Sequence, residues 1–577
     1  MDTMKLYAEV QPWTDGQAEK DAEPLLCSRE PAEKHWSIAL GIAVIVLACV
    51  VVAHGIHKGE FDYYVDEAQH AVTGLFVADA VHDMPLRHPV QYAYRYYAQY
   101  PSVAIVHWPP LFYVFEGLNF LILGPNVVAA RLTVLLFVIL LCYQWFKLVE
   151  ELGYPLAAAA STAILVLLPT MLMFEKTVML EIPSLALAVA SIRSWIHYLE
   201  YGQSRFIYRF ALWISAALLC KQTSVFVLLF CLLSLAATRR WERLWNRDVF
   251  LAAGLCVLLV VPFYTLMLIA QGHAVAKDLG SHQMSGWKRL TYYWTTLPAT
   301  FTIPMLGLSG LGFLTAPRWD RKRNTLLMAC WVLAGYVTFT FFGQNEARFS
   351  IYWFPPLVYF AAGLLMMGFR TPAFRLAMRT VAVAIVMLMA YRGWGYERPY
   401  IAGYETVAAR LVGTYRSGIV LFDGRIPGNF VFYIRALDPR RQFLTLRKSL
   451  YVSDVRQGNN SEELLHSGQD LQNLFRNAGI RFVVVADNVP LRFPSQVMLR
   501  ESLHSDQFQL LGSFPIQSNQ PSWQGTRLLL YENKDWAPPA DKVLRLRMLT
   551  LSHDIVVPLD KFDFVAKPSL GRGPGSQ

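Results

Sequence analysis

The chain has 577 residues and is poor in charged residues and in patterned cysteines. Asp, Glu, Lys and Arg together make up 16% of it, whereas a soluble globular domain has roughly 25%. None of the seven cysteines is paired at metal-ligand spacing, and none follows Cys330. These absences exclude a disulfide scaffold and predict that a C-terminal domain folds without disulfide bonds. The sequence also lacks internal repeats and coiled-coil heptads.

Apolar residues dominate the composition. Hydrophobic residues make up 54% of the chain, and the mean hydropathy is +0.32. This composition excludes a disordered protein and an ordinary soluble enzyme, and it indicates an α-helical polytopic membrane protein. The formal net charge of +10 is typical of cytoplasmic loops in such a protein, so we expect no nucleic-acid partner.

Eleven apolar runs approach the roughly 20 residues that a helix needs to cross a bilayer. A further run, 110–123, follows Pro109-Pro110 and is too short, so it is either a span or an interfacial helix. The eleven predicted spans are 37–54, 127–147, 154–173, 180–199, 208–220, 222–238, 248–270, 292–315, 325–342, 350–369 and 377–394.

The distribution of positive charge favours an interfacial helix at 110–123. With a cytoplasmic N-terminus and no crossing there, five successive basic loops all lie on the cytoplasmic side, as the positive-inside rule requires. These loops contain Lys147; Arg205 and Arg209; Arg239, Arg240, Arg243 and Arg247; Arg318, Arg321, Lys322 and Arg323; and Arg370, Arg375 and Arg379. The outer side then receives 55–126, 174–181, the neighbourhood of Lys221, 271–291, 343–350 and everything after about 395.

The domain organisation follows from these runs. We expect a cytoplasmic segment 1–36, a transmembrane domain 37–395 with a large first outer loop 55–126, a small soluble α/β domain 396–565, and a disordered tail 566–577. The α/β assignment rests on short β-rich runs around a helical stretch, 461–477. The expected strands are 418–422, 430–434, 442–446, 481–486 and 526–531.

Two acidic sites are expected at the outer surface. The first outer loop carries four carboxylates, Glu60, Asp62, Asp66 and Glu67, and runs into a predicted amphipathic helix 66–81 on the membrane surface. The bland interpretation is a solvated loop, whereas Asp66 at such an interface could act as a general base. Glu181 begins a later span, where it either complements the helix dipole or shares a site with Asp66.

Cations and a histidine could complete this site. Lys221 interrupts two apolar runs. It either binds a lipid phosphate or is a snorkelling lysine whose charged end reaches the water. Arg348 could contact phosphate in a bidentate manner or simply pair with Glu346. His107, which precedes Trp108 and the proline pair, is either a ligand or structural.

The order of these motifs resembles the glycosyltransferase C (GT-C) superfamily, in the branch with the protein O-mannosyltransferases and the bacterial aminoarabinose and Rgt-type transferases. The resemblance covers roughly 37–370, and it departs from many relatives by His107-Trp108 in place of a lysine and by Glu181 in place of Asp. The matching motifs are Asp66-Glu67-Ala68-Gln69-His70, Pro109-Pro110-Leu111-Phe112-Tyr113 with Gly124 and Arg131-Leu132, Glu181-Ile182-Pro183, Lys221-Gln222-Thr223, and Arg348-Phe349 before Pro355.

The resemblance implies an inverting transfer of a sugar from a polyprenyl-phosphate donor to a lipid, glycan or protein acceptor on the outer, periplasmic side of a bacterial inner membrane. It implies Asp66 as general base, with Glu67 and Glu181 shaping the catalytic site. It leaves open whether a divalent cation takes part. The residues that it implies for substrate binding are His107, Arg131, Lys221, Gln222, Glu346 and Arg348.

Two other functions compete with this reading. A transporter or flippase of a lipid-linked saccharide would explain the spans equally well, but transporters usually place ionisable residues near the bilayer midplane, whereas the acids here lie at the outer ends of spans. A non-catalytic assembly subunit with an exterior domain is the second rival, and it predicts that Asp66 and Glu181 are dispensable.

Overall fold

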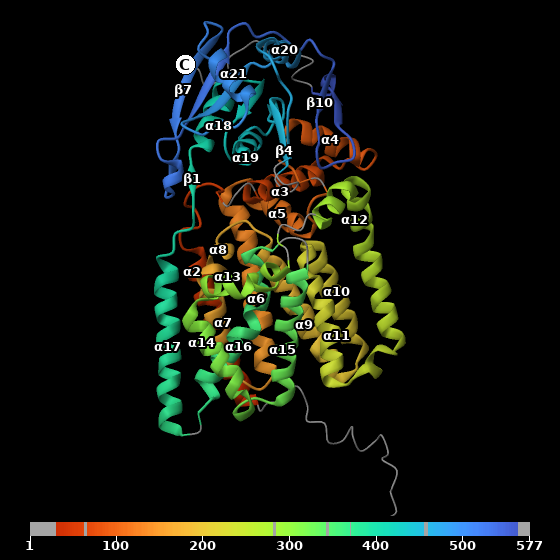
Figure 1. The fold of residues 1–577 in the computed structure, drawn as a ribbon, viewed down its shortest axis with the longest axis vertical. Coiled ribbons are helices and arrows are strands. Elements are labelled where there is room, and N and C mark those ends of the chain that lie inside the picture. The colour runs from red at the N-terminus through yellow and green to blue at the C-terminus, as the bar shows by residue number, and fades with distance from the viewer. Residues whose placement is uncertain are drawn as a thin grey trace, which may run out of the picture.

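The computed structural model describes residues 31–62, 66–104, 106–280, 284, 286–341, 345–369, 371–454 and 460–562. Residues 1–30 of the predicted cytoplasmic segment, Arg370 and the predicted tail 566–577 lie outside these ranges. The described chain forms a helical bundle at one end and a C-terminal α/β domain at the other, with three helices of the first outer loop between them (Figure 1).

All eleven predicted spans are helical in the bundle, although two of them are broken. Among the described residues, six helices are long and apolar enough to cross a membrane, or up to eight if each of two bent pairs is one span. The other three predicted spans are α9, which carries Glu181 and Arg193, and the shorter α10 and α11. The bundle helices are α2 (Pro31–Ala53), α6 (Val127–Glu151), α7 (Pro155–Leu167), α8 (Pro169–Glu175), α9 (Glu181–Tyr201), α10 (Ser204–Cys220), α11 (Phe226–Thr238), α12 (Arg247–Gly280), α13 (Gly286–Phe301), α14 (Ile303–Thr315), α15 (Lys322–Phe341), α16 (Phe354–Met367) and α17 (Pro372–Trp394).

Proline explains the break between α7 and α8. The two helices meet at 69°, and Pro169 begins α8 because proline has no N–H to continue the preceding helix. Helices α13 and α14 meet at 111° around Thr302, whose φ is +71°. The connection between α11 and α12 and the start of α17 lie at the end of the bundle opposite the C-terminal domain (Figure 1). Two of the five predicted basic loops and the C-terminal domain therefore lie at opposite ends of the bundle.

The first outer loop folds into a layer of three helices, α3 (Asp66–Asp83), α4 (Pro89–Gln99) and α5 (Leu111–Leu123). They lie between the bundle and the C-terminal domain (Figure 1). This placement fits the prediction that the short apolar helix α5 does not cross the membrane.

Helix α3 corrects the prediction of an amphipathic helix on the membrane surface. The helix is present, but it is buried on opposite faces rather than along one stripe. Helix α5 packs against one face so closely that a Cβ atom at Gly74 would lie 2.3 Å from Glu116 Oε2. Helix α19 (Pro427–Leu437) of the C-terminal domain packs against another, where a Cβ atom at Gly428 would lie 2.7 Å from the Cβ of Ala68. Membrane lipid is therefore not the partner of this helix; protein is.

The C-terminal domain is the predicted small α/β domain. Its five-stranded sheet has the order β3-β2-β6-β9-β7. Strands β3, β2 and β6 are parallel to one another, and β9 is antiparallel to both of its neighbours, β6 and β7. Four helices accompany the sheet, and three two-stranded ribbons, β1-β8, β4-β5 and β10-β11, surround it. The elements are β1 (Ile401–Ala402), α18 (Tyr404–Thr414), β2 (Gly418–Asp423), α19, β3 (Phe443–Leu446), β4 (Tyr451–Asp454), β5 (Asn460–Glu463), α20 (Gly468–Ala478), β6 (Phe482–Asp487), α21 (Pro494–Ser502), β7 (Phe508–Pro515), β8 (Gln517–Ser518), β9 (Arg527–Asn533), β10 (Val543–Leu546) and β11 (Ile555–Pro558).

Several elements of this domain were not predicted, and three differences have a local physical reason. The expected strand 430–434 is part of α19, because Pro427 starts a helix there and its apolar residues pack between the sheet and α3. The expected helix 461–477 begins only at Gly468, where the Ser467 side chain caps it by accepting from the Asp470 N–H. Strand β7 was not predicted, because its burial along the sheet edge does not alternate clearly.

Two carboxylates of the first outer loop fasten this layer to the C-terminal domain. Glu60 accepts hydrogen bonds from the backbone N–H groups of Gly403, Tyr404 and Glu405 at the start of α18. Asp62 accepts from the side chain of Gln520. Burial raises the pKa of both carboxyls to about 7. Neither residue fits the bland alternative of a solvated loop, because both are buried.

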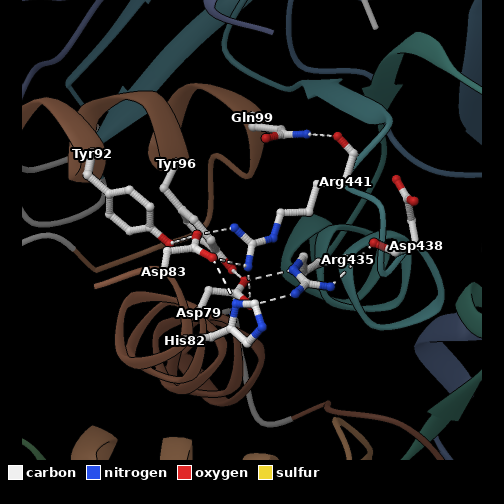
Figure 2. Close-up of polar contacts among 9 residues, drawn as sticks. All are labelled: Asp79, His82, Asp83, Tyr92, Tyr96, Gln99, Arg435, Asp438 and Arg441. Carbon is white, nitrogen blue, oxygen red and sulfur yellow. Dashed lines mark hydrogen bonds and ion pairs between the residues drawn. The ribbon is translucent and has the colours of Figure 1, made fainter. Parts of the chain in front are cut away.

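At the other end of α3, two more carboxylates hold the same domain (Figure 2). Asp79 is buried and forms ion pairs with Arg435 and Arg441, and Asp83 pairs with Arg441 as well. Tyr96 donates to Asp79 over 2.7 Å. The layer and the domain are therefore joined by buried, hydrogen-bonded charges at both ends of α3.

Candidate active site

Four charged residues that are far apart in the sequence meet where the bundle reaches the α3 layer. Lys221 Nζ lies 2.6 Å from Glu181 Oε1, and Arg348 Nη1 lies 3.5 Å from the same oxygen. Arg348 Nη1 also lies 3.4 Å from Asp66 Oδ2. One arginine thus links the two acidic sites, and Asp66 and Glu181 belong to a single cluster of charges.

Glu181 is the buried centre of this cluster. It is the first residue of α9, so the helix dipole favours its negative charge. Its side chain has no exposed surface, and its second oxygen, Oε2, has no hydrogen-bond partner among the described residues. A buried carboxylate is stable here because two cations compensate it. The residue therefore organises cations and has no open face toward water.

Asp66 is the accessible acid of the pair. It begins α3, and about a quarter of its side chain, 24%, is exposed. Its contact with Arg348 is long, and Arg348 also serves Glu346, with Nε 2.6 Å from Glu346 Oε2. Three carboxylates thus compete for one guanidinium. Glu181 is fully buried and Glu346 has the shortest contact with Arg348, so Asp66 is the partly exposed carboxylate that this guanidinium holds at a longer distance.

Lys221 stands at a break in the bundle. It follows α10 with extended backbone (φ −158°, ψ 134°), and the short 3-10 helix Gln222–Val225 leads from it into α11. Only 7% of its side chain is exposed. Gln222 Oε1 is buried and has no hydrogen-bond partner among the described residues. The Lys221 ammonium and the unsatisfied Gln222 amide oxygen lie at the same break, where they can bind a polar group that comes close to them.

Arg348 is held by a second irregular segment, the 3-10 helix Ala347–Trp353. The ring of Phe349 lies between the two cations, 5.6 Å from Arg348 Cζ and 5.8 Å from Lys221 Nζ. Tyr352 accepts or donates hydrogen bonds with Ser184 and Thr223, at 2.5 Å and 2.6 Å. These contacts tie three segments of the bundle together and fix the spacing of the cations.

His70 is a site residue that the sequence analysis quoted in its motif but did not select. Its Nδ1 lies 2.7 Å from the hydroxyl of Tyr113, and its ring lies 4.4 Å from that of Trp108. Burial lowers the pKa of His70 to about 3, and Lys221 and Arg348 act in the same direction against Glu181. The imidazole is therefore neutral, and the signal that could have found it is its position one helical turn after Asp66.

Through its carboxylate, Glu67 binds backbone N–H groups of the protein itself. It is buried, and its carboxylate accepts from the backbone N–H groups of Asp62 and Val178, each over 3.0 Å. These bonds connect the loop before α3 to the segment before α9. Glu67 therefore ties the segment that carries Asp66 to the segment that leads to Glu181.

The guanidinium of Arg131 is used within the protein. It is buried and donates to four backbone carbonyls, those of Ile56, Lys58, Gly59 and Glu60. This set of bonds shapes the turn after α2 and does not include the cluster around Arg348. The prediction that Arg131 binds substrate has no support in these contacts.

His107 is placed beside the site rather than in the charged cluster. Its ring lies 4.2 Å from that of Trp108, at a steep angle, and Trp108 in turn contacts His70. In the described part of the chain, no three His, Cys, Asp or Glu side chains come together as ligands of a metal ion. The carboxylates of the cluster are instead compensated by Lys221 and Arg348.

The fold and the cluster define an integral membrane protein with a charged site where its helical bundle meets the α3 layer, beneath an α/β domain. Residues 107–265 match the family described as dolichyl-phosphate-mannose-protein mannosyltransferase. No curated protein matches the chain by sequence.

Solved structures give the wider relationship. ArnT from Cupriavidus metallidurans bound to undecaprenyl phosphate is similar with a TM-score of 0.58 and 13% identity, over 86% of this chain and 99% of that one. The apo state of the same ArnT is similar with a TM-score of 0.56 and 13% identity, over 88% and 100%. The chain therefore has the fold of the GT-C glycosyltransferase superfamily, which confirms the resemblance read from its motifs.

Proposed function

We propose that this protein is a membrane glycosyltransferase that moves a sugar from a polyprenyl-phosphate donor to an acceptor, with inversion at the sugar carbon. The observation that carries the proposal is the cluster of Asp66, Glu181, Lys221 and Arg348 at the junction of bundle and outer layer. The matching family is named for a lipid-phosphate sugar, dolichyl-phosphate-mannose, and the similar ArnT structure is bound to undecaprenyl phosphate.

The cations of the cluster would receive the donor phosphate. Lys221 and Arg348 both face Glu181, and Phe349 lies between them. A phosphate entering between the cations would exchange part of the Glu181 contact for charge-assisted hydrogen bonds of its own. The unsatisfied Gln222 Oε1 would accept from a sugar hydroxyl at the same break in the bundle.

Asp66 would act as the general base. In one step, the acceptor oxygen or nitrogen forms a bond to the anomeric carbon while the bond from that carbon to the phosphate oxygen breaks. The acceptor proton passes to Asp66, and the electron pair leaves with the polyprenyl phosphate. Lys221 and Arg348 would stabilise the charge that grows on the leaving phosphate. Because attack and departure occur on opposite faces of the carbon, the configuration inverts.

The other predicted residues take supporting roles in this scheme. Glu181 holds the two cations, and Glu67 positions the segments that carry Asp66 and Glu181. Glu346 orients Arg348. His107 stays a predicted substrate contact, next to Trp108. The basic loops at the opposite end of the bundle support a site on the periplasmic side of a bacterial inner membrane.

The experiment is a transfer assay with purified protein, a panel of labelled polyprenyl-phosphate sugars, and envelope lipids, glycans or proteins as acceptors. We expect one donor to label an acceptor, NMR of the product to show inverted configuration, and Asp66→Asn to abolish the transfer. Equal transfer by wild type and Asp66→Asn would remove Asp66 as the base. Transport of a donor across vesicles without transfer from any donor would favour the transporter.

A further inference from the structure

A second charged hollow lies at the far end of α3, away from the cluster around Arg348. Its cavity volume is about 200 Å³, below the roughly 300–1,000 Å³ of sites that enclose a whole small ligand, so it can take one charged group of a larger molecule. Helix α4, the turn before β3 and the short 3-10 helix Leu559–Lys561 enclose it. Its polar lining includes Arg95, Gln99, Arg440, Arg441, Gln442 and Lys561.

Positive charge dominates this lining. Four of the lining residues are Lys or Arg, and none is Asp or Glu in the part of the chain that the structure describes. Arg441 is compensated by Asp79 and Asp83. Arg95, Arg440 and Lys561 are exposed and form no ion pair with any described residue. The hollow therefore presents three uncompensated cations toward solvent.

The walls of the hollow are held in place before any ligand arrives. Gln99 Nε2 donates to the carbonyls of Arg441 and Phe443, over 2.7 Å and 2.9 Å, and so fixes the turn that carries Arg440 (Figure 2). Arg441 has a φ of +55°, a left-handed conformation that its surroundings must enforce. On the other wall, the guanidinium of Arg95 rests over the ring of Tyr92, 5.8 Å from its centroid.

The hollow and the candidate active site are connected by one rigid element. Asp66 begins α3, and Asp79 and Asp83, which hold Arg441, lie near its end. At 1.5 Å per residue, the rise from Asp66 to Asp79 is about 20 Å. An extended glycan could reach from one site to the other, whereas a single sugar could not.

We propose that this hollow binds the phosphate or carboxylate groups of an anionic glycan, and that this glycan is the acceptor whose far end is presented to Asp66. Arginine suits planar, two-point contact with carboxylate and phosphate, and lysine adds a mobile point charge. The identity of the ligand as acceptor rests on the proposed function, but the anion site itself does not.

Binding tests the site without any need for catalysis. Purified protein in nanodiscs of neutral lipid is titrated with tetragalacturonate against neutral maltotetraose, and with glucose 6-phosphate against glucose. We expect each anionic probe to bind at least about tenfold more tightly than its neutral match, and the difference to shrink as salt screens the charges. The two pairs of probes separate carboxylate from phosphate as the preferred group.

The decisive variant is Arg440→Gln/Lys561→Gln. It removes two exposed cations and leaves the ion pairs of Asp79 with Arg435 and Arg441 intact. The matched control is Arg410→Gln/Arg527→Gln, which removes two exposed cations of the same domain outside the hollow. We expect the first variant to lose the tenfold preference and the control to keep it. Equal binding by the two variants would overturn the site, and so would a preference that appears only with anionic lipid in the nanodisc.

The same variants separate this inference from the proposed function. If Asp66→Asn binds tetragalacturonate as wild type does and no donor is ever consumed, the anion site stands and the transferase assignment fails. If sugar transfer proceeds with unchanged KM for an anionic acceptor in Arg440→Gln/Lys561→Gln, the transferase stands and the acceptor site fails.

Discussion

Helix α3 carries two carboxylates at each end, and the protein uses the two ends differently. At the end of the helix, Asp79 and Asp83 are matched by Arg435 and Arg441 and by tyrosine hydroxyls. At its start, Asp66 shares Arg348 with Glu181 and Glu346. The paired carboxylates Asp79 and Asp83 join two domains. At the start of the helix, three carboxylates share two cations, so not every negative charge is neutralised.

The pKa of Asp83 shows how far the compensation goes. Burial would raise this pKa, but hydrogen bonds from Arg441, His82 and Tyr92 outweigh it and lower the pKa to about 2. A carboxyl in such surroundings binds a proton poorly. It is suited to hold Arg441 and unsuited to act as a base, in contrast to the role that we propose for Asp66.

The comparison is tested most strongly by replacing the accessible acid. Asp66→Asn should lower kcat of the transfer by about 10²- to 10⁴-fold, the range for loss of a general base. It should change the free energy of unfolding by less than about 1 kcal/mol, because the contact with Arg348 is long and partly exposed. Transfer kinetics and thermal unfolding in detergent measure the two effects.

Asp487→Asn is the matched control for that variant. Asp487 is an exposed carboxylate at the end of β6, far from both ends of α3 in the sequence. It should keep wild-type kcat. A similar loss of kcat in both variants would mean that the assay reports net charge and not a base.

Replacing the compensated acid should give the opposite result. Asp79→Asn leaves the largely buried Arg435 without its carboxylate partner. Breaking a buried ion pair in this way destabilises a protein by about 3–5 kcal/mol. Hydrogen exchange should rise in α19 and β3, where the domain meets α3. The double variant Asp79→Asn/Arg435→Met should be less destabilised than the sum of the single variants; strict additivity would show that the pair is not coupled.

The cations of the candidate active site give a smaller expected effect. Lys221→Met should raise KM for the polyprenyl-phosphate donor by about 10- to 100-fold, because a charge-assisted hydrogen bond contributes about 1.5–3 kcal/mol and 1.4 kcal/mol is tenfold. Lys58→Met is the control, since Lys58 forms an exposed ion pair with Glu397 outside the cluster. An unchanged KM in Lys221→Met would remove the lysine from the phosphate site.

The smallest effect concerns pH and the loop that precedes α3. Burial raises the pKa of Glu60 from 4.5 to about 7, so between these values the folded protein holds a proton that the unfolded chain has lost. Linkage then requires the stability to fall as pH rises from about 4.5 to about 7. Glu60→Gln should flatten this part of a plot of Tm against pH, whereas Glu501→Gln, at an exposed position, should not.

Several parts of the site followed from sequence because they depend on local chemistry. Asp66 and Glu181 each stand at the first position of a helix, and Lys221 interrupts two apolar runs. Such positions are visible in a sequence without any knowledge of neighbours. Their meeting at Arg348 followed only from their shared side of the membrane, and the contacts in the cluster fit that inference.

Other parts could not be read, because their partners lie far away in the chain. Arg131 resembles a substrate ligand in its motif, yet it binds carbonyls about seventy residues earlier. Glu60 and Asp62 look like ordinary acids of a loop, yet they hold a domain that follows hundreds of residues later. Burial by a distant segment changes the meaning of an ionisable residue, and no local pattern records it.

The sequence by itself determined the membrane bundle, the short helix at 110–123 and the presence of an α/β domain, because apolar length, charge asymmetry and β-rich runs are properties of contiguous segments. Only the tertiary structure decided that α3 lies between protein layers and not on lipid, and which of its carboxylates have enough cations around them. Compensation of charge depends on residues hundreds of positions apart, and it is the packing of the C-terminal domain and the bundle on α3 that distributes those cations.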